Sequence, residues 1–266
     1  AWGILGTGGI ARIFARGRRH AQRGKLVAVA SRTQAAAAQF AQEFGLTHAY
    51  DSYDALLADP QVDAVYISLP NHLHACWTVR CAEAGKHILC EKSLATNYPE
   101  AMTAIEAARA HDVFLMEAFM YRCHPQTAKL VELIRAGVIG EVRVIQAHFS
   151  YNMRGPQDNI RQKNEYAGGG IMDVGCYCTS MARLLAGAAL GQEFANPIIT
   201  SDGYRSELAL QGYAHIGTES GVDEWATAIV RFPGDIVANL TCGIQVKVDP
   251  ALRIWGSTGH LIVPNP

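Results

Sequence analysis

The chain has 266 residues, of which 49% are hydrophobic and 18% are charged, and its net charge at pH 7 is −1. This is the composition of a globular protein with one large or two medium domains, and no cluster of Lys and Arg indicates a nucleic-acid or membrane-surface partner. The longest apolar runs have the length of strands and are too short to span a membrane.

The first 120 residues alternate apolar runs with helix-like segments. The predicted strands are 2–5, 25–30, 47–50, 64–69, 87–90 and 113–118, and the predicted helices are 10–21, 34–44, 52–58, 72–84 and 98–110. Such alternation is typical of an α/β fold, a doubly wound parallel sheet with right-handed crossovers. We therefore predict a dinucleotide-binding domain over residues 1–120.

The pattern changes after residue 120. The predicted elements are a helix at 124–136, a strand at 141–152, a polar loop at 159–166, a helix at 171–186, and strands at 222–232, 235–245, 252–256 and 260–263. Alternating strands joined by glycine-containing turns favour antiparallel pairing. We predict a second, α+β domain over residues 121–266 with an open, largely antiparallel sheet.

A glycine-rich turn follows the first strand and opens the first helix. In the segment Gly6–Ala11, the first glycine permits a tight turn, the second permits close approach to a phosphate, and Ala11 is small enough for helix-on-strand packing. A helix N-terminus in this position attracts a pyrophosphate. We predict that the cofactor is bound here by Gly6, Gly8, Gly9 and Ile10.

The end of the second strand bears on the choice of cofactor. A carboxylate here holds the ribose 2′-hydroxyl of NAD, but this chain has Ser31 followed by Arg32. A hydroxyl and a guanidinium suit a 2′-phosphate, so we predict a preference for NADP(H), with NAD(H) as an alternative. Arg32 as an ordinary surface charge is the other interpretation.

Ligands of doubly wound sheets bind at the carboxyl ends of the strands. After the fourth strand, we predict that Pro70, Asn71 and His74 face the cofactor, although a histidine at a helix start can also be a cap or a packing residue. After the fifth strand, Glu91 and Lys92 are candidate cofactor contacts, and Lys92 can also stabilise an oxyanion on substrate. An ordinary ion pair in the loop is the alternative for these two residues.

The helix that follows Gly168–Gly170 carries Asp173 and Tyr177. Their i, i+4 spacing predicts that both lie on one face of the helix. A tyrosine near a positive charge is a common acid/base group, although Tyr177 can also be a packing residue. Arg154 and Arg161 precede the glycines and are candidate substrate contacts or surface charges.

The seven cysteines contain no CxxC pair and lie mostly in apolar segments. Together with the lack of a signal-peptide pattern, this predicts a reduced, cytoplasmic protein. The histidines show no paired-ligand spacing, so we predict no metal site.

Four strings in this order resemble the Gfo/Idh/MocA family of NAD(P)-dependent oxidoreductases. They are GILGTGGIA at 3–11, AGKHILCEKS at 84–93, EAFMYRCHPQ at 117–126 and GGGIMDVGCYCTSMARLLAG at 168–187. The resemblance covers essentially the whole chain and is greatest to the dihydrodiol and sugar dehydrogenase branch. It implies a Rossmann first domain, a homodimer or tetramer formed through the second-domain sheet, and a sugar or cyclic diol as substrate.

The resemblance also implies catalytic roles. Tyr177 would be the acid/base on the substrate oxygen, Lys92 would assist it, and Asp173 would support the substrate. A non-catalytic dinucleotide- or sugar-sensing regulator and an NAD-dependent glycoside chemistry are the alternatives on the same fold.

Two departures from the family pattern stand out. Ser93 replaces a proline that often follows a cis bond, so we expect Lys92 to sit on a differently shaped loop. Family chains usually continue beyond the equivalent of Pro266, and this chain lacks a starting methionine, so we expect the second domain to be incomplete.

Overall fold

The computed structural model describes residues 1–18, 20–153, 159–198 and 210–266. The chain divides into two compact units, Ala1–Ala118 (unit 1) and Phe119–Pro266 (unit 2). We describe each unit by itself.

Unit 1 contains a six-stranded sheet in the order β3-β2-β1-β4-β5-β6, with every neighbouring pair parallel. The strands are β1 (Trp2–Leu5), β2 (Leu26–Ala30), β3 (His48–Tyr50), β4 (Ala64–Ile67), β5 (His87–Cys90) and β6 (Leu115–Glu117). The strand order reverses between β1 and β4, and the carboxyl ends at such a switch point are where doubly wound sheets bind ligands. The predicted parallel sheet is confirmed.

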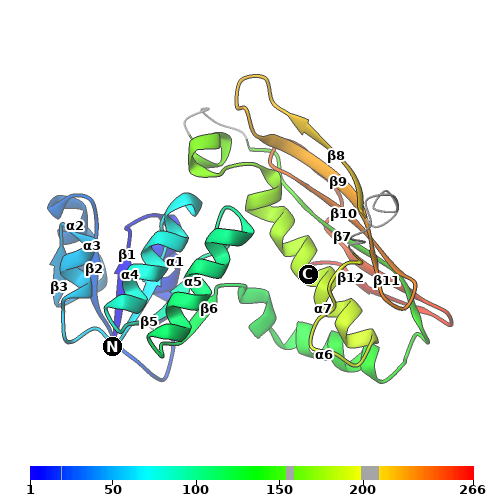
Figure 1. Ribbon diagram of the computed structural model, residues 1–266, viewed down its shortest axis with the longest axis horizontal. Coiled ribbons are helices and arrows are strands. Elements are labelled where there is room, and N and C mark those ends of the chain that lie inside the picture. Colours follow the sequence, from blue (N-terminus) through cyan, green and yellow to red (C-terminus); the bar gives the residue numbers. More distant parts are fainter. Residues whose placement is uncertain (19, 154–158, 199–209) are drawn as a thin grey trace. The chain divides into compact units, whose positions relative to one another are not determined.

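Helices cover both faces of this sheet (Figure 1). They are α1 (Gly9–Arg18), α2 (Gln34–Phe44), α3 (Tyr53–Leu57), α4 (His74–Glu83) and α5 (Tyr98–Ala110), with a short 3-10 turn, η1 (Asn71–Leu73), before α4. One core layer joins α1 and α2 to the sheet around Phe40 and Tyr66, and the other lies around Leu56, Cys81 and Ile88. Burial of apolar side chains on both faces explains why the strands read as continuous apolar runs.

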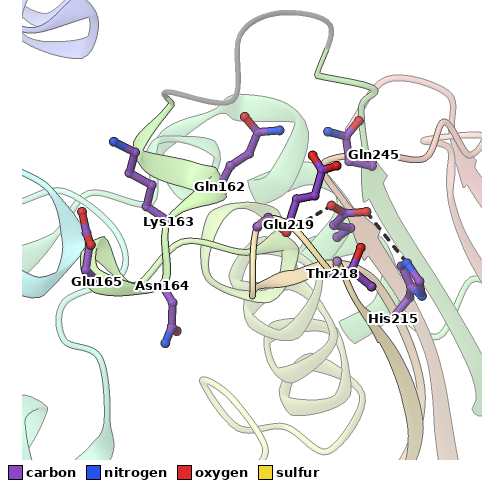
Figure 2. Close-up of a pocket in the computed structure, with 11 residues that line it drawn as sticks. Gln162, Lys163, Asn164, Glu165, His215, Thr218, Glu219 and Gln245 are labelled. Atoms are coloured by element: carbon purple, nitrogen blue, oxygen red, sulfur yellow. Dashed lines mark hydrogen bonds and ion pairs between the residues drawn. The ribbon is translucent and has the colours of Figure 1, made fainter.

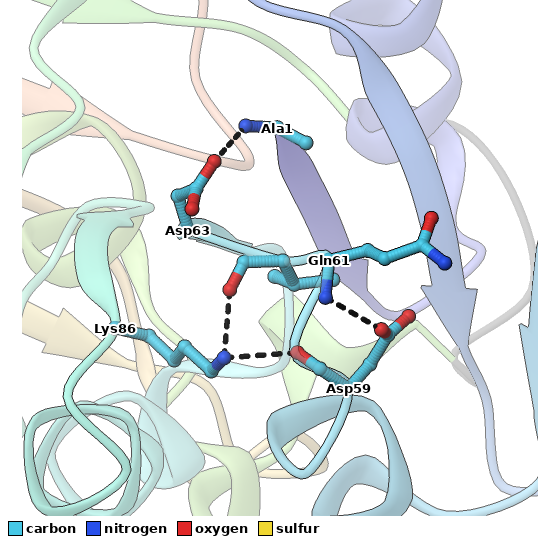
Figure 3. A network of polar contacts seen from close by, with 6 residues as sticks. Ala1, Asp59, Gln61, Asp63 and Lys86 are labelled. Atoms are coloured by element: carbon cyan, nitrogen blue, oxygen red, sulfur yellow. Dashed lines mark hydrogen bonds and ion pairs between the residues drawn. The ribbon is translucent and has the colours of Figure 1, made fainter.

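The amino ends of β4 and β5 are joined by a polar network away from the carboxyl ends (Figure 3). The ammonium of Lys86 donates to the carbonyl oxygens of Asp59, at 2.9 Å, and Val62, at 2.7 Å. The carboxylate of Asp59 accepts the N–H of Gln61 at 2.8 Å, and Asp63 pairs with the amino group of Ala1. These contacts stabilise the turn that leads into β4.

Unit 2 contains a second six-stranded sheet in the order β12-β11-β7-β10-β9-β8. The strands are β7 (Val142–Ser150), β8 (Leu210–Ile216), β9 (Asp223–Phe232), β10 (Ile236–Gly243), β11 (Leu252–Gly256) and β12 (His260–Val263). All neighbouring pairs are antiparallel except β7 and β10, which run parallel. The predicted largely antiparallel sheet is therefore confirmed.

The remaining elements of unit 2 are helical. They are η2 (Met120–Cys123), α6 (Pro125–Arg135), η3 (Ile160–Gln162), η4 (Asn164–Tyr166), the π-helical turn η5 (Ile171–Gly175) and α7 (Cys176–Ala189). Helix α7 packs against β7 and β10, and α6 packs against α7 (Figure 1). The core between them is centred on Ile145, Leu185 and Ala238, all of which are fully buried. Within the described part of the chain, no helix is both long enough and apolar enough to span a membrane.

Candidate functional site

The glycine turn after β1 has a backbone that requires glycine at its first position. Gly6 has a φ of +100°, and a Cβ there would lie 3.0 Å from Ser68 Oγ and 3.2 Å from the Ser68 carbonyl oxygen. The N–H of Gly6 donates to the carbonyl of Ala30 at 2.9 Å. The turn is therefore fixed against the carboxyl ends of β2 and β4.

The next two glycines of this turn are open to solvent. Gly8 and Gly9 are exposed, and a Cβ at either would meet no heavy atom within 4 Å. The packing of the chain itself thus leaves space over the N-terminus of α1, which has no acidic residue in its first turn. Exposed N–H groups at a helix N-terminus fit a pyrophosphate, so these residues suit the dinucleotide that the sequence predicts.

The carboxyl end of β2 carries no carboxylate at the predicted ribose position. Ser31 is 8% exposed, and its hydroxyl lies 3.4 Å from that of Thr7 in the glycine turn. Arg32 is exposed, and its charge acts on Tyr53, where it opposes the burial that raises the pKa of that phenol. Ser31 therefore stands beside the glycine turn, and Arg32 follows it in the chain at an exposed position after β2.

The loop after β5 places Glu91 over a buried tyrosine. The hydroxyl of Tyr66 donates to the Glu91 carboxylate, and Tyr66 is 2% exposed and stacked on Phe14. Burial raises the pKa of Glu91, while the hydrogen bond from Tyr66 and the charge of Lys92 act in the opposite direction. Glu91 is thus anchored within unit 1 at the base of the loop that carries Lys92.

The peptide bond between Lys92 and Ser93 is cis. The family proline at this position often follows a cis bond, and Ser93 follows one as well. The expectation that Ser93 gives the loop a different shape is therefore wrong for this bond. The next residue, Leu94, donates its N–H to Glu117 Oε1 at 2.8 Å. Lys92 itself is half-buried at the carboxyl end of β5.

His74 is placed differently from the prediction that it faces the cofactor. It is 1% exposed, with Nδ1 2.7 Å from the Ser93 carbonyl oxygen and Nε2 2.7 Å from the Leu69 carbonyl oxygen. Both ring nitrogens are therefore used inside unit 1. Burial lowers the pKa of His74, and the two carbonyl contacts act against that shift. Pro70 and Asn71 precede it at the start of η1, at the carboxyl side of β4.

The three glycines before η5 allow close backbone packing in unit 2. A Cβ on Gly168 would lie 2.5 Å from the Arg161 carbonyl oxygen, and one on Gly169, where φ is +107°, would overlap the side chain of Asp223. Asp223 accepts the N–H of Ile171 at 2.6 Å. Sequence reasoning missed this residue, because its partner lies far away along the chain.

Asp173 lies in η5 and not in an α-helix. The N–H of Cys176 reaches the carbonyl of Ile171, a π-type bond, and α7 begins only at Cys176. The predicted continuous helix over 171–186 is therefore wrong at its start, and it ends later, at Ala189. Single π turns occur frequently at functional sites.

A polar cluster surrounds the Asp173 carboxylate. Asp173 is 8% exposed, Arg161 Nε lies 3.0 Å from its Oδ1, and the hydroxyl of Tyr151 donates to its Oδ2. Burial and the bond to Asp173 raise the pKa of Tyr151. Tyr151 is a second residue that the sequence analysis missed. Arg154, the other predicted substrate contact, lies outside the described residues.

Tyr177 lies in the first turn of α7 among aromatic side chains. Its ring is 5.5 Å from that of Phe119 in an edge-on arrangement and 5.6 Å from that of Phe149, and its hydroxyl lies 3.5 Å from the Met120 sulfur. The charge of Arg161 interacts electrostatically with Tyr177 as well as with Asp173. Unit 2 thus brings Arg161, Asp173 and Tyr177 together.

Lys92 belongs to unit 1 and Tyr177 to unit 2, so their cooperation stays a prediction.

The seven cysteines all lie among the described residues, and none of them forms a disulfide. Burial raises the pKa of Cys178 and of Cys242 to about 12 each. Among the described residues, no group of three or more His, Cys, Asp or Glu side chains is arranged to hold a metal ion.

Comparison with known proteins agrees with this architecture. Residues 1–119 match the oxidoreductase family with an NAD-binding Rossmann fold, and residues 127–262 match the GFO/IDH/MocA C-terminal domain. The chain belongs to the Gfo/Idh/MocA oxidoreductase family. The resemblance drawn from the four sequence strings is therefore confirmed, for the first domain as well as the second.

Two curated Gfo/Idh/MocA relatives are informative. D-xylose 1-dehydrogenase (NADP(+)) 2 of Haloferax volcanii is 45% identical over 186 residues, which are 70% of this chain and 57% of that protein. Trans-1,2-dihydrobenzene-1,2-diol dehydrogenase of Homo sapiens is 30% identical over 267 residues, or 100% of this chain and 74% of that protein. The chain therefore spans little more than half of the first relative.

A solved structure shows the same fold. The 3-ketoreductase of Actinomadura kijaniata, in complex with NADP and TDP-benzene, has a TM-score of 0.84 and 30% identity, and the match covers 98% of this chain and 75% of the reductase. The Gfo/Idh/MocA fold is thus shared along nearly the whole chain.

Proposed function

We propose that this chain is an NADP(H)-dependent oxidoreductase that acts on the C–OH or C=O group of a sugar or a cyclic diol. The observation that carries the proposal is the Gly6–Ile10 turn, which is open over the N-terminus of α1 and stands beside Ser31, the residue that precedes Arg32. The relatives support the substrate class, since their names specify xylose and a dihydrodiol, and that of the xylose dehydrogenase specifies NADP(+).

We assign the cofactor contacts residue by residue. The N–H groups at Gly8, Gly9 and Ile10 hold the pyrophosphate, and Ser31 and Arg32 hold the 2′-phosphate by charge-assisted hydrogen bonds. Pro70, Asn71 and Lys92, at the carboxyl ends of β4 and β5, face the nicotinamide ribose. When bound, the nicotinamide supplies the two-electron redox chemistry of the reaction.

The residues of unit 2 act on the substrate. In oxidation, the Tyr177 phenolate accepts the proton of the substrate hydroxyl, and in reduction the Tyr177 hydroxyl donates a proton to the carbonyl oxygen. The guanidinium of Arg161, which interacts with Tyr177, favours the deprotonated form of the phenol. Asp173, held by Arg161 and Tyr151, accepts a hydrogen bond from a neighbouring substrate hydroxyl. Lys92 stabilises the developing negative charge on the reacting oxygen.

We assign His74 and Glu91 positioning roles in place of the predicted direct contacts. His74 fixes the Ser93 carbonyl, and Glu91 is fixed by Tyr66, so both set the position of the Lys92 backbone between them. Rigid support of this kind keeps a functional group in its working geometry.

We also propose a cytoplasmic homodimer or tetramer that associates through the sheet of unit 2. Exposed apolar side chains on its strands support this interface, including Ile229 at 49%, Trp255 at 38% and Ile262 at 52% exposed. Large apolar side chains exposed on one sheet are a common sign of an interaction surface.

The proposal is tested by following the NADPH absorbance with a panel of aldoses, ketoses and cyclic diols, with NADH as the alternative cofactor. We expect turnover with at least one class of substrate and a lower KM for the phosphorylated cofactor. Cofactor binding without turnover across the panel would contradict the catalytic proposal and favour a regulator.

A further inference from the structure

Unit 2 contains a polar pocket that the proposed reaction does not use. Its volume is about 880 Å³, and it lies between the η3–η4 segment, the turn that joins β8 to β9, and Gln245 (Figure 2). The lining residues that matter for its chemistry are Gln162, Lys163, Glu165, His215, Glu219 and Glu224.

Gln162 indicates that this pocket is built to receive a ligand. Its neighbour Arg161 pairs with Asp173, whereas Gln162 is 7% exposed, and its amide oxygen finds no hydrogen-bond partner among the residues that the structure describes. Figure 2 shows the amide directed toward the side of the pocket formed by Glu219 and Gln245. A buried amide oxygen is costly unless it accepts a hydrogen bond, so a ligand with an N–H or O–H donor would satisfy it.

The charges around the pocket determine which donor is favoured. The lining residues include three carboxylates, those of Glu165, Glu219 and Glu224, but a single lysine, Lys163, so the lining is negative overall. The ammonium of Lys163 lies over the ring of Tyr166, 5.8 Å from its centroid. A cation with hydrogen-bond donors would therefore be attracted, and an anion would be repelled.

One wall of the pocket is held in position by its own contacts. The ring of His215 is stacked on that of Trp225 at 5.6 Å, and its Nε2 lies 3.9 Å from Glu224 Oε2. The hydroxyl of Ser220 donates to the other oxygen of Glu224 at 3.1 Å. The Glu224 carboxylate is thus fixed at the pocket surface, which reduces the entropy lost when a ligand binds.

We propose that this pocket binds a small molecule that carries both a protonated amine and hydroxyl groups, the chemistry of an amino sugar. The ammonium lies against Glu219 and Glu224, and a ligand donor satisfies the amide oxygen of Gln162. The site is formed by unit 2 alone and does not depend on the oxidoreductase activity.

Calorimetric titration of the whole chain tests the ligand chemistry with three matched sugars. D-glucosamine carries the amine, N-acetyl-D-glucosamine blocks it, and D-glucose replaces it with a hydroxyl. We expect glucosamine to bind about tenfold more tightly than the other two, the ratio that one charge-assisted contact supplies. Equal affinity for all three, or no binding of glucosamine, overturns the proposal.

Variants test the location. Gln162→Leu and Glu219→Gln should each weaken glucosamine binding by about tenfold, and Gln162→Glu, which adds a carboxylate, should strengthen it. The control Glu193→Gln alters an exposed glutamate that does not line the pocket and should leave the affinity unchanged. Asp173→Asn should also leave it unchanged. Loss of binding in Asp173→Asn with no effect of the pocket variants would place glucosamine at the proposed substrate site and overturn the assignment.

Discussion

Nδ1 of His74 lies 2.7 Å from the carbonyl oxygen of Ser93, so one buried side chain joins the start of α4 to the loop after β5. Nε2 of the same ring lies 2.7 Å from the carbonyl of Leu69, at the end of β4. The imidazole therefore connects two backbone positions that adjoin the predicted nicotinamide contacts, Leu69 before Pro70 and Ser93 after Lys92.

Replacing His74 by leucine is expected to leave both carbonyls without this partner. A neutral imidazole has a single N–H and can donate to only one of these carbonyls, so one buried acceptor loses its hydrogen bond and the free energy of unfolding should fall by about 1–3 kcal/mol. Denaturant unfolding measures this loss of stability. NADPH titration, at a temperature at which the variant is folded, measures the affinity for the cofactor, which should fall if the loop after β5 is displaced. We expect weaker NADPH binding in His74→Leu and partial recovery in His74→Gln.

The control for the His74 variants is His111→Gln, at an exposed position after α5. A folded His74→Leu variant with parental NADPH affinity would refute the positioning role.

Gly6 and Gly8 provide a matched pair in one turn. Gly6→Ala places a Cβ against Ser68 at a positive φ and should cost about 1–3 kcal/mol of stability. Gly8→Ala meets no atom of the chain, so it should unfold like the parent and yet bind NADPH about tenfold more weakly. Thermal unfolding and cofactor titration of the two variants separate these effects. If Gly8→Ala binds NADPH normally, the phosphate is held elsewhere.

Arg32→Asp reverses the charge at the end of β2. A carboxylate repels a 2′-phosphate and accepts a hydrogen bond from a 2′-hydroxyl, so the ratio of kcat/KM for NADPH to that for NADH should fall by at least about tenfold. Steady-state kinetics with both cofactors measure this ratio. Arg23→Asp makes the same charge change at an exposed position before β2 and serves as the control. An unchanged ratio in Arg32→Asp would mean that Arg32 is an ordinary surface charge.

Tyr177→Phe removes the proposed acid/base group but keeps the aromatic ring among Phe119 and Phe149. Turnover should fall by about 10²–10⁴-fold, because general acid–base catalysis contributes that much. Stability and NADPH affinity should stay at parental values. Tyr98→Phe, at a tyrosine that is 76% exposed, should be fully active. Near-parental turnover of Tyr177→Phe would show that another group moves the proton.

Asp223 makes a pH-dependent contribution to stability. Burial raises the pKa of its carboxyl above the ordinary value of 3.8, although hydrogen bonds from the N–H groups of Ile171 and Gly170 act in the opposite direction. The folded chain therefore holds this proton at a pH at which the unfolded chain has lost it. The resulting stabilisation is fully present below the unfolded pKa and is lost as the pH rises through the folded pKa.

Asp223→Asn removes this titration and keeps an amide oxygen that can accept the N–H of Ile171. The difference in unfolding free energy, parent minus variant, should therefore decrease between about pH 3 and pH 6. Denaturant unfolding across that range measures it. A difference that is constant or increases with pH would contradict the direction of the shift.

The sequence predicted unit 1 more closely than unit 2 for a physical reason. Parallel strands buried on both faces read as apolar runs, and local caps such as Thr33 and Asn97 mark where α2 and α5 begin. Strand β8 was missed because its residues are mostly exposed and its pairing comes from β9. An edge strand of this kind carries little local signal.

The candidate site was predictable in part. The glycine turn and the Ser31-Arg32 pair follow local rules of chain geometry, and the Ser31 hydroxyl lies 3.4 Å from that of Thr7 in the turn. Asp223 and Tyr151 act through partners distant in the sequence, Ile171 and Asp173, so local spacing contains no sign of them. The π turn at η5 follows Gly168–Gly170, which pack closely against backbone from other parts of unit 2. The i, i+4 spacing used to predict a regular α-helix takes no account of such contacts.

The connection that follows β7 has a consequence for how this enzyme family can vary. Tyr151, Arg161, Asp173 and Tyr177 all lie on the stretch of chain that leaves the sheet at the end of β7 and rejoins it at the edge strand β8, which pairs with β9. Both ends of that excursion are held by main-chain hydrogen bonds between adjacent strands. The chain between them can therefore change in length and content, and with it the substrate, while the sheet that supports it keeps its register.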